Sequence, residues 1–364
     1  MTIEEKRLTV EDGVVTFLDT TQPFEIRLLN DEVKSPWGFD FLPDGRLLVT
    51  EKEGKLRIFD IDTRTSAMIE GLPAVHSKGQ GGLLDVVVHN DFETNGWIYL
   101  SAAVEVSEKK RTTRIMRYRL ENSQLKDATE IYEAQPAVDA NIHFGSAMVF
   151  DTEGHLYITV GDRRQRYLSQ DLGTSLGKVI RLRDDGSVPV DNPFLNRPDA
   201  LPEIFSYGHR NPQGITIDRA SGRIWVAEHG PRGGDEINLL QAGTNYGWPV
   251  ITYGEEYAGG KIGEGTEKVG MAQPEYHYVP SIGTAGIAWY DGDALPGWQG
   301  NLFVAGLRST SVSRVNLRSA QETEEQRLLE QFAFRFRNIK QGPDGFLYLL
   351  GENGGILQIT PLSQ

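Results

Sequence analysis

The stretch AMVFDTEGHLYITV, residues 147–160, contains the unit that decides the fold. A short apolar segment leads into the polar turn DTEG, and a second apolar segment follows it. Glycine in the turn permits the positive φ that a tight hairpin requires, and both flanks have the apolar and β-branched composition of strands. The stretch therefore predicts an antiparallel hairpin.

The same unit occurs six times, and each copy is followed by a third apolar segment. The hairpin units lie at 38–50, 85–102, 147–160, 215–227, 287–305 and 338–350. The third segments lie at 55–60, 114–120, 178–183, 236–240, 312–317 and 356–360. Starts that are 47 to 72 residues apart match the length of a propeller blade, and no long segment has helical periodicity with capping signals. The repeats predict an all-β, six-bladed β-propeller of four-stranded antiparallel blades rather than a β-sandwich, which does not require six similar units.

The two ends of the chain complement each other in this scheme. The last unit has three strands, and the segment FEIRLL (24–29) precedes the first unit. We expect this segment to supply the missing outer strand and to close the ring. On this basis we expect residues 1–364 to form a single propeller domain, because all-β folds often extend to this length as one unit.

Composition excludes several classes of function. The 364 residues include 37 Lys and Arg but 51 Asp and Glu, which gives a net charge of −14. Such a chain repels phosphate backbones, so a nucleic-acid partner is not expected. The absence of Cys excludes disulfides and thiolate chemistry. No apolar run approaches the roughly 18 residues of a spanning helix, and the N-terminus shows no signal peptide, so no integral membrane segment is expected.

The unusual polar residues concentrate on one face of the predicted propeller. In an up-and-down blade, the loops after the second and fourth strands share a face, and the hairpin turns lie on the other. The loops of the first kind include HSKGQGG (76–82), ANIHFGS (140–146), GDRRQRYLSQDLGTSLG (161–177), YGHRNPQG (207–214), EHGPRGG (228–234), AGLRSTS (305–311) and FRFRN (334–338). They predict a functional funnel above a rigid scaffold.

The residues of these loops suggest a site for a cation, a site for a polyanionic ligand and a general base. Asp235 and Glu236 follow a Gly-Pro-Arg-Gly-Gly loop that can expose carbonyl oxygens, which are ligands that Ca²⁺ prefers, although the pair could also only cap a strand. Arg residues in three blades suggest a small polyanionic ligand, since the planar guanidinium binds carboxylates in bidentate fashion. These are Arg210, Arg308 and Arg337. His143 is the natural candidate for a general base, since an ordinary imidazole has a pKa of about 6.5.

Together the motifs resemble the soluble quinoprotein sugar dehydrogenases, the glucose/sorbosone dehydrogenase family, and especially their aldose sugar dehydrogenase branch. The resemblance extends from about residue 36 to 351. GHRNPQG followed by EHGPRGGDE and NYGWP is a specific combination, and the matching stretches also include PWGFDFLPDG, GQGGLLDVVV, HFGSAMVFD, QDLGTSLGKVIRL, PVDNPF and GPDGFLYLL. The family fold is a six-bladed propeller, which the repeats indicate independently.

The resemblance implies pyrroloquinoline quinone (PQQ) and Ca²⁺ as cofactors and His143 as the general base. The residues that it implies at the cofactor are Gln80, Arg210, Asn211, Arg308 and Arg337. Through their carbonyl groups, Gly230 and Pro231 would hold the cofactor Ca²⁺. A second, structural Ca²⁺ site would include Glu236 and the Tyr246 carbonyl, with Asp235 nearby.

The implied reaction is oxidation of an aldose at C1 to its lactone, with electrons passed to an external acceptor. The family usually acts in the periplasm or outside the cell, and a monomer is favoured. Ile142 departs from relatives that place a polar residue there to orient the imidazole. Three residues of the 161–177 loop receive no role from the resemblance: Arg163, Arg164 and Arg166.

Two other functions remain open at this level. Six-bladed propellers also include Ca²⁺-dependent lactonases and esterases, which need carboxylates and a His over a metal but no Arg cluster. A non-catalytic binding propeller would have no reason to combine His143, Arg210 and the loop at Gly230. Lactone hydrolysis without quinone, or failure of dye reduction with PQQ, would identify these alternatives.

Overall fold

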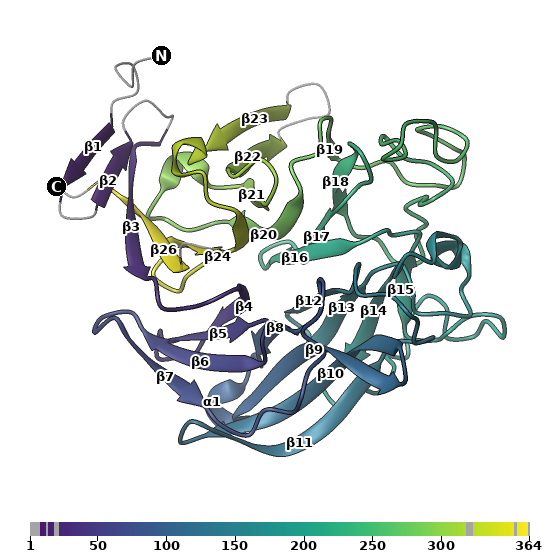
Figure 1. Ribbon diagram of the computed structural model, residues 1–364, viewed down its shortest axis with the longest axis horizontal. Helices are drawn as coiled ribbons and strands as arrows, with labels where there is room; N and C mark the ends of the chain where they lie inside the picture. Colours follow the sequence, from purple (N-terminus) through teal and green to yellow (C-terminus); the bar gives the residue numbers. More distant parts are fainter. Residues whose placement is uncertain (1–7, 12–13, 18–21, 318–322, 353–354, 363–364) are drawn as a thin grey trace.

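The computed structural model describes residues 8–11, 14–17, 22–317, 323–352 and 355–362. In these parts of the chain, six antiparallel sheets surround a central axis (Figure 1). The innermost strand of each sheet contacts the innermost strands of both neighbours, so the sheets form a closed ring. The predicted six-bladed β-propeller is confirmed.

The first three blades follow one another along the chain. Blade one contains β4 (Pro36–Phe41), β5 (Leu47–Glu51), β6 (Lys55–Asp60) and β7 (Thr65–Ile69). Blade two contains β8 (Leu83–Val88), β9 (Trp97–Ser107), β10 (Lys110–Glu121) and β11 (Gln124–Glu133). Blade three contains β12 (Gly145–Phe150), β13 (His155–Val160), β14 (Lys178–Arg183) and β15 (Ile204–Tyr207). The predicted third strands correspond to β6, β10 and β14.

The other three blades complete the ring. Blade four contains β16 (Pro212–Asp218), β17 (Arg223–Glu228), β18 (Asp235–Leu239) and β19 (Tyr276–Tyr278). Blade five contains β20 (Thr284–Tyr290), β21 (Asn301–Gly306), β22 (Val312–Leu317) and β23 (Thr323–Leu328). Blade six contains β24 (Phe336–Gln341), β25 (Leu347–Gly351), β26 (Gly355–Pro361) and β3 (Phe24–Asn30).

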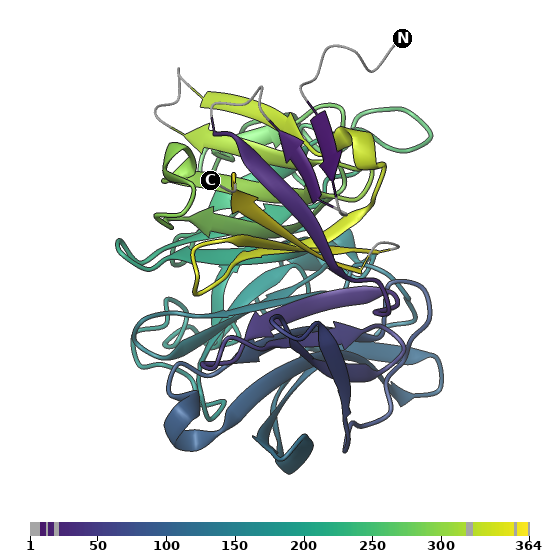
Figure 2. The ribbon, with the colours of Figure 1, turned by 90° about the vertical axis from the view of Figure 1, so that its left-hand side faces the viewer.

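Strand β3 closes the ring as predicted. It pairs antiparallel with β26 (Figure 2). In this pairing Phe24 faces Pro361 and Ile26 faces Ile359. The blade-six sheet extends further than the sequence predicted, because β2 (Val14–Phe17) pairs with β3 and β1 (Leu8–Glu11) pairs with β2. Blade six is therefore part of a six-stranded sheet.

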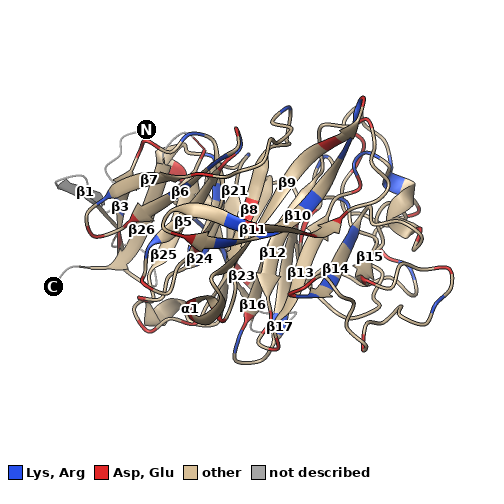
Figure 3. Cartoon of the chain, turned by 90° about the horizontal axis from the view of Figure 1, so that it is seen from below, with Lys and Arg blue, Asp and Glu red and all other residues tan. Residues whose placement is uncertain are grey.

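Helical structure is scarce, as expected. Among the described residues there are four short helices: α1 (Phe92–Asn95), η1 (Arg166–Gln170), η2 (Pro296–Trp298) and η3 (Glu330–Phe332). None of the helices in the described ranges is long and apolar enough to cross a membrane. Figure 3 shows basic and acidic residues mixed along the side of the ring in view, without a continuous basic tract on its described part.

The inner strands shape the centre of the ring. Each of the six has a register shift near its first residues, at the end where the polar loops lie. Such bulges bend a strand and redirect its side chains. Apolar side chains fill the space between neighbouring blades, for example Tyr99 and Phe150 between blades two and three. This packing makes the ring a rigid support for the loops on the funnel face.

Candidate active site

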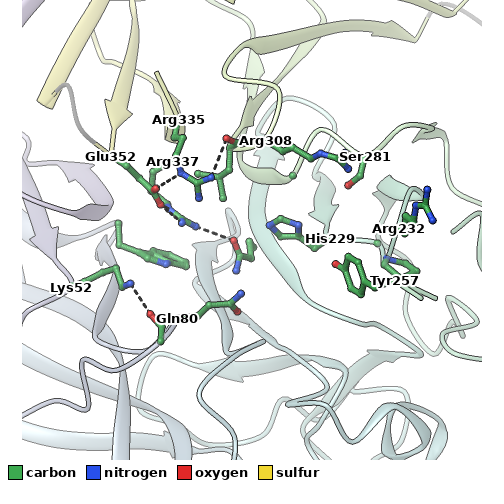
Figure 4. Close-up of a pocket in the computed structure, with 17 residues that line it drawn as sticks. Lys52, Gln80, His229, Arg232, Tyr257, Ser281, Arg308, Arg335, Arg337 and Glu352 are labelled. Carbon is green, nitrogen blue, oxygen red and sulfur yellow. Dashed lines mark hydrogen bonds and ion pairs between the residues drawn. The ribbon is translucent and has the colours of Figure 1, made fainter. Parts of the chain in front are cut away.

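A cavity of about 660 Å³ opens at the axis on the face of the polar loops (Figure 4). Five of the predicted site residues line it: Gln80, Gly230, Pro231, Arg308 and Arg337. The predicted funnel loops 228–234 and 334–338 contribute further lining residues, which include His229, Arg232 and Arg335, whereas Lys52, Tyr257 and Glu352 were not expected from the sequence. The funnel on the predicted face therefore exists, and its walls come from several blades.

Cationic side chains dominate one side of the cavity. Figure 4 shows Arg308, Arg335 and Arg337 gathered near Glu352, away from Tyr257. Arg337 donates from Nε to Glu352 at 3.1 Å, and the Arg335 Nε donates to the same carboxylate at 2.6 Å. Burial lowers the pKa of Arg337, and Glu352 opposes this effect. Within the described part of the chain, the Arg308 guanidinium has no ion-pair partner, so this wall carries more positive than negative charge.

His143 lies at the start of blade three, two residues before β12. Its backbone N–H donates to the Gln80 Oε1 at 2.7 Å, which ties it to the cavity wall. Its φ of +57° is unusual for a residue other than glycine and indicates local backbone strain. A β-carbon on Gly161 would lie 2.0 Å from the His143 carbonyl oxygen. Glycine at 161 therefore allows the two loops of this blade to come together.

The imidazole of His143 is oriented by Asp162. The Nδ1 atom lies 2.7 Å from the Asp162 Oδ1. An ionised carboxylate can only accept, so Nδ1 carries the proton and Nε2 is left as the basic atom. Burial lowers the pKa of His143, and the hydrogen bond to Asp162 opposes this effect. The side chain is therefore neutral near pH 7 and able to accept a proton.

Asp162 is itself held on both oxygens. Oδ1 also accepts from the Arg164 backbone N–H at 2.8 Å, and Oδ2 accepts from the Trp248 indole Nε1 at 2.9 Å. Ile142 is apolar and cannot orient the His143 side chain by a side-chain hydrogen bond. The orienting group Asp162 comes instead from the 161–177 loop, which leaves the second strand of the hairpin at the same end as His143.

Arg210 and Asn211 lie directly behind the cavity wall. The Arg210 Nη1 donates to the His229 carbonyl oxygen at 3.0 Å, and the Asn211 carbonyl oxygen accepts from the His229 N–H at 3.1 Å. Neither residue lines the large cavity, and nor does His143. Each of the three contacts a lining residue, either Gln80 or His229.

The oxygen-rich loop after β17 has the features of a cation site. A β-carbon on Gly230 would lie 2.1 Å from the Gly234 carbonyl oxygen, so only glycine allows the loop to close this tightly. Within the described chain, no hydrogen bond reaches the carbonyl oxygens of Gly230, Pro231 or Tyr246. A small second cavity shares His229, Gly230 and Pro231 with the first, and its other lining residues are Arg210, Glu228, Gly234, Glu236, Tyr246, Trp248, Ile251 and Thr252.

The carboxylates beside this loop differ in how well they are compensated. Burial and the neighbouring Glu228 raise the pKa of Glu236 to about 8, so a cation placed between these two side chains would relieve their repulsion. Asp235 is already satisfied, because its Oδ1 accepts from the Gly230 N–H at 2.9 Å and its Oδ2 from the Gly283 N–H at 2.6 Å. Asp235 thus holds the loop in place. No group of three or more acidic or His side chains forms a metal cluster in the described ranges.

The three Arg residues of the 161–177 loop have different environments. Arg163 is buried, and its Nε donates to the Ile142 carbonyl oxygen at 2.9 Å while its Cζ lies 3.5 Å from the centroid of the Phe144 ring. Arg166 pairs with Glu256 at 2.6 Å. Arg164 is exposed and contributes its backbone N–H to Asp162. Arg163 therefore stabilises the 140–146 loop, which contains His143, through buried contacts with its backbone.

The fold and site together define a propeller enzyme scaffold with a cationic axial cavity and a His–Asp pair that contacts the cavity wall through Gln80. The chain belongs to the Glucose / Sorbosone dehydrogenase family, whose model matches residues 33–358. This confirms the family that the motifs indicated.

Individual relatives agree with this assignment. The chain is 39% identical over 343 residues to the aldose sugar dehydrogenase YliI of Escherichia coli, with 92% of each chain covered. The apo-form structure of the soluble aldose sugar dehydrogenase from E. coli superimposes with a TM-score of 0.89, at 38% identity, over 93% of this chain and 100% of that one. The PQQ-bound aldose sugar dehydrogenase from Streptomyces coelicolor gives a TM-score of 0.76 at 27% identity, over 92% of this chain and 97% of that chain.

Proposed function

We propose that this protein oxidises aldose sugars at C1 to lactones, with PQQ and Ca²⁺ as cofactors and an external electron acceptor. The observation that carries the proposal is the oriented pair His143–Asp162 beside a cationic cavity of about 660 Å³. The family assignment supports the sugar substrate, and the PQQ-bound relative supports the cofactor. An extracytoplasmic location is an expectation from the family alone.

The donor set of the cavity fits PQQ. This cofactor carries three carboxylates, and Arg308, Arg335 and Arg337 offer guanidinium groups on one wall. The uncommitted carbonyl oxygens of Gly230 and Pro231 are hard ligands suited to Ca²⁺ at the same cavity. When bound, PQQ would supply the quinone that accepts the hydride.

Residues of the chain would carry out the proton transfer, the charge stabilisation and the binding of a second cation. His143 would accept the proton of the anomeric hydroxyl at Nε2, and Asp162 would stabilise the imidazolium that results. Arg210, which donates to the carbonyl oxygen of the cavity-lining His229, would stabilise the negative charge that develops at the cofactor during hydride transfer. Glu236 and the Tyr246 carbonyl oxygen would hold a second, structural Ca²⁺.

The test is reconstitution of the purified protein. PQQ and Ca²⁺ are titrated separately and together while dye reduction is followed with a panel of aldoses. We expect reduction only when both are present, with a lactone as product. No reduction with any aldose would overturn the proposal, and lactone hydrolysis with Ca²⁺ alone would replace it with a hydrolase.

A pair of variants tests the base. His143→Gln should retain PQQ and Ca²⁺ but lose at least about 10²-fold in kcat, since positioned acid–base catalysis contributes that much or more. His155→Gln is the matched control, because His155 makes a similar contact with Asp151 at 3.1 Å at the opposite end of the same hairpin. Equal rates in the two variants would place the base elsewhere.

A further inference from the structure

The segment between β18 and β19, residues 240–275, reaches into the neighbouring blade. Asn245 forms a parallel bridge with Tyr207, so the segment continues the blade-three sheet on its outer edge. The backbone of Trp248 is fixed just beyond the end of β15, because its N–H donates to the Gly208 carbonyl oxygen at 2.8 Å. Its own carbonyl oxygen accepts from the Gln170 Nε2 at 2.8 Å.

From this anchored backbone, the indole of Trp248 extends to Asp162. The side chain is buried, and Nε1 donates to the Asp162 Oδ2 at 2.9 Å. The other carboxylate oxygen is used by His143 and by the Arg164 N–H. The indole also lies near two guanidinium groups, with the Cζ of Arg210 5.4 Å from the ring centroid and that of Arg166 at 5.5 Å.

We propose that Trp248 is a positioning residue for proton transfer, which acts on His143 through Asp162. This inference rests on the proposed function for its kinetic consequences. With Trp248 in place, the carboxylate cannot turn about its Cβ–Cγ bond without breaking a buried hydrogen bond, and the imidazole keeps one orientation.

The same contact tunes the strength of the base. A donor on Oδ2 withdraws negative charge from Oδ1, so the carboxylate stabilises the imidazolium less than an unshared one would. The other charged or titratable groups that act on His143 are Arg164 and Arg210, with His229 on the cavity side. Loss of the indole N–H should therefore leave His143 more mobile and more basic.

The variant Trp248→Phe removes the donor and keeps an aromatic ring. We expect kcat to fall about 10- to 100-fold, the range typical of residues that orient a functional group, with little change in KM. The acid limb of the pH profile should move to higher pH. Trp298→Phe is the control, because Trp298 is fully buried in the core between blades five and six, where it packs on Phe24 and Phe303.

A double-mutant cycle separates positioning from general packing. If Trp248 acts through Asp162, then Trp248→Phe should cost nothing further in kcat when Asp162→Asn is already present. Additive losses would overturn the proposal. Replacement of Trp248 by 3-benzothienylalanine, which has nearly the same shape but no N–H, gives a second variant if the Phe variant does not fold.

The decisive readout needs no cofactor. Nitrogen-15 NMR of His-labelled protein, with the His143 signals identified from His143→Gln, reports its tautomer and titration midpoint. We expect the Nδ1–H tautomer in the wild type and a higher midpoint in Trp248→Phe, with no change in Trp298→Phe. An unchanged tautomer and midpoint in both Trp248 variants would overturn the inference. Absence of PQQ-dependent activity in the wild type would instead contradict only the proposed function.

Discussion

His143 and Asp162 lie on opposite arms of one hairpin and meet because of its register. Gly145 pairs with Val160 at the top of the β12–β13 ladder, and the two functional residues come two positions further out on each strand. Their contact of 2.7 Å is thus a direct extension of the strand pairing. The scaffold sets the separation of the base and its partner, and no flexible loop needs to bring them together.

The Asp162→Asn variant should lose activity although the two side chains have nearly the same shape. An amide that donates to Nδ1 would favour the Nε2–H tautomer and remove the basic atom. We expect kcat to fall by about 10² or more while PQQ binding, followed by absorbance, is unchanged. Asp151→Asn, at the other end of the hairpin, is the control. Near wild-type turnover in Asp162→Asn would show that this carboxylate does not orient the base.

Activity should persist at mildly acidic pH. Burial lowers the pKa of His143 below its ordinary value of 6.5, and only the neutral imidazole accepts a proton. The rate therefore falls as the pH drops through the lowered pKa, so the midpoint of the acid limb should lie below 6.5. Stopped-flow reduction of bound PQQ between pH 5 and 8 measures it. A midpoint above 7 would contradict this prediction.

Arg163→Met should destabilise the protein and disturb the base. The change leaves the carbonyl oxygens of Ala140 and Ile142 without their buried donor. We expect the free energy of unfolding to fall by about 2–3 kcal/mol, as measured by chemical denaturation. Arg164→Met, at an exposed position next in the chain, should change stability by less than about 0.5 kcal/mol. Similar losses in the two variants would show that the buried contacts of Arg163 are not decisive.

Two N-terminal truncations should differ sharply in stability. Removal of residues 1–30 deletes β3, with the buried side chains of Phe24 and Ile26, and leaves the β26 edge unpaired. Removal of residues 1–22 deletes β1 and β2 but keeps β3. Thermal unfolding should show a large loss for the longer truncation and a smaller one for the shorter. Equal melting temperatures would remove the closing role assigned to β3.

Calcium should stabilise the cofactor-free protein through Glu236. Binding to the native state alone adds about 2.7 kcal/mol at a concentration 100-fold above Kd. A thermal shift with Ca²⁺ that is lost in Glu236→Gln is the expected result. The control is Glu255→Gln, since Glu255 is exposed and pairs with Arg232. A shift of equal size in both variants would place the cation elsewhere.

The sequence predicted the fold well because each blade repeats a local signal. A hairpin such as 147–160 is decided by its own turn glycine and apolar flanks, and the structure places β12 and β13 in this stretch. The outer strands β1 and β2 were not predicted, although LTVE and VVTF are β-rich segments joined by Asp12-Gly13, a combination typical of hairpins. What the sequence did not show is that this hairpin adds to the outer edge of β3 and extends the blade-six sheet.

A site residue could be predicted from the sequence where its position in the blade repeat alone places it at the cavity. Gln80, in a loop, and Arg337, near the start of the inner strand β24, line the cavity because both positions lie at the axis, and the blade repeat fixes that location. Asp162 could have been found by extending the hairpin register from Gly145. The motif NYGWP marked Trp248, but its contact with Asp162 could not be predicted, since Trp248 lies in the 36-residue segment 240–275 between two strands of another blade. Such long-range contacts depend on tertiary packing rather than on local sequence.

The pairing of β3 with β26 also constrains the order of events during synthesis. Strand β3 leaves the ribosome before any blade is complete, whereas β26 is made after five blades. Until β26 has been made, the inner edge of β3 is unpaired. An unpaired strand edge can bind other chains, so the nascent chain is exposed to aggregation during this time. Because this contact joins distant parts of the chain, its formation is slow relative to the local hairpins. Ring closure is therefore the step at which a chaperone that shields strand edges would matter most.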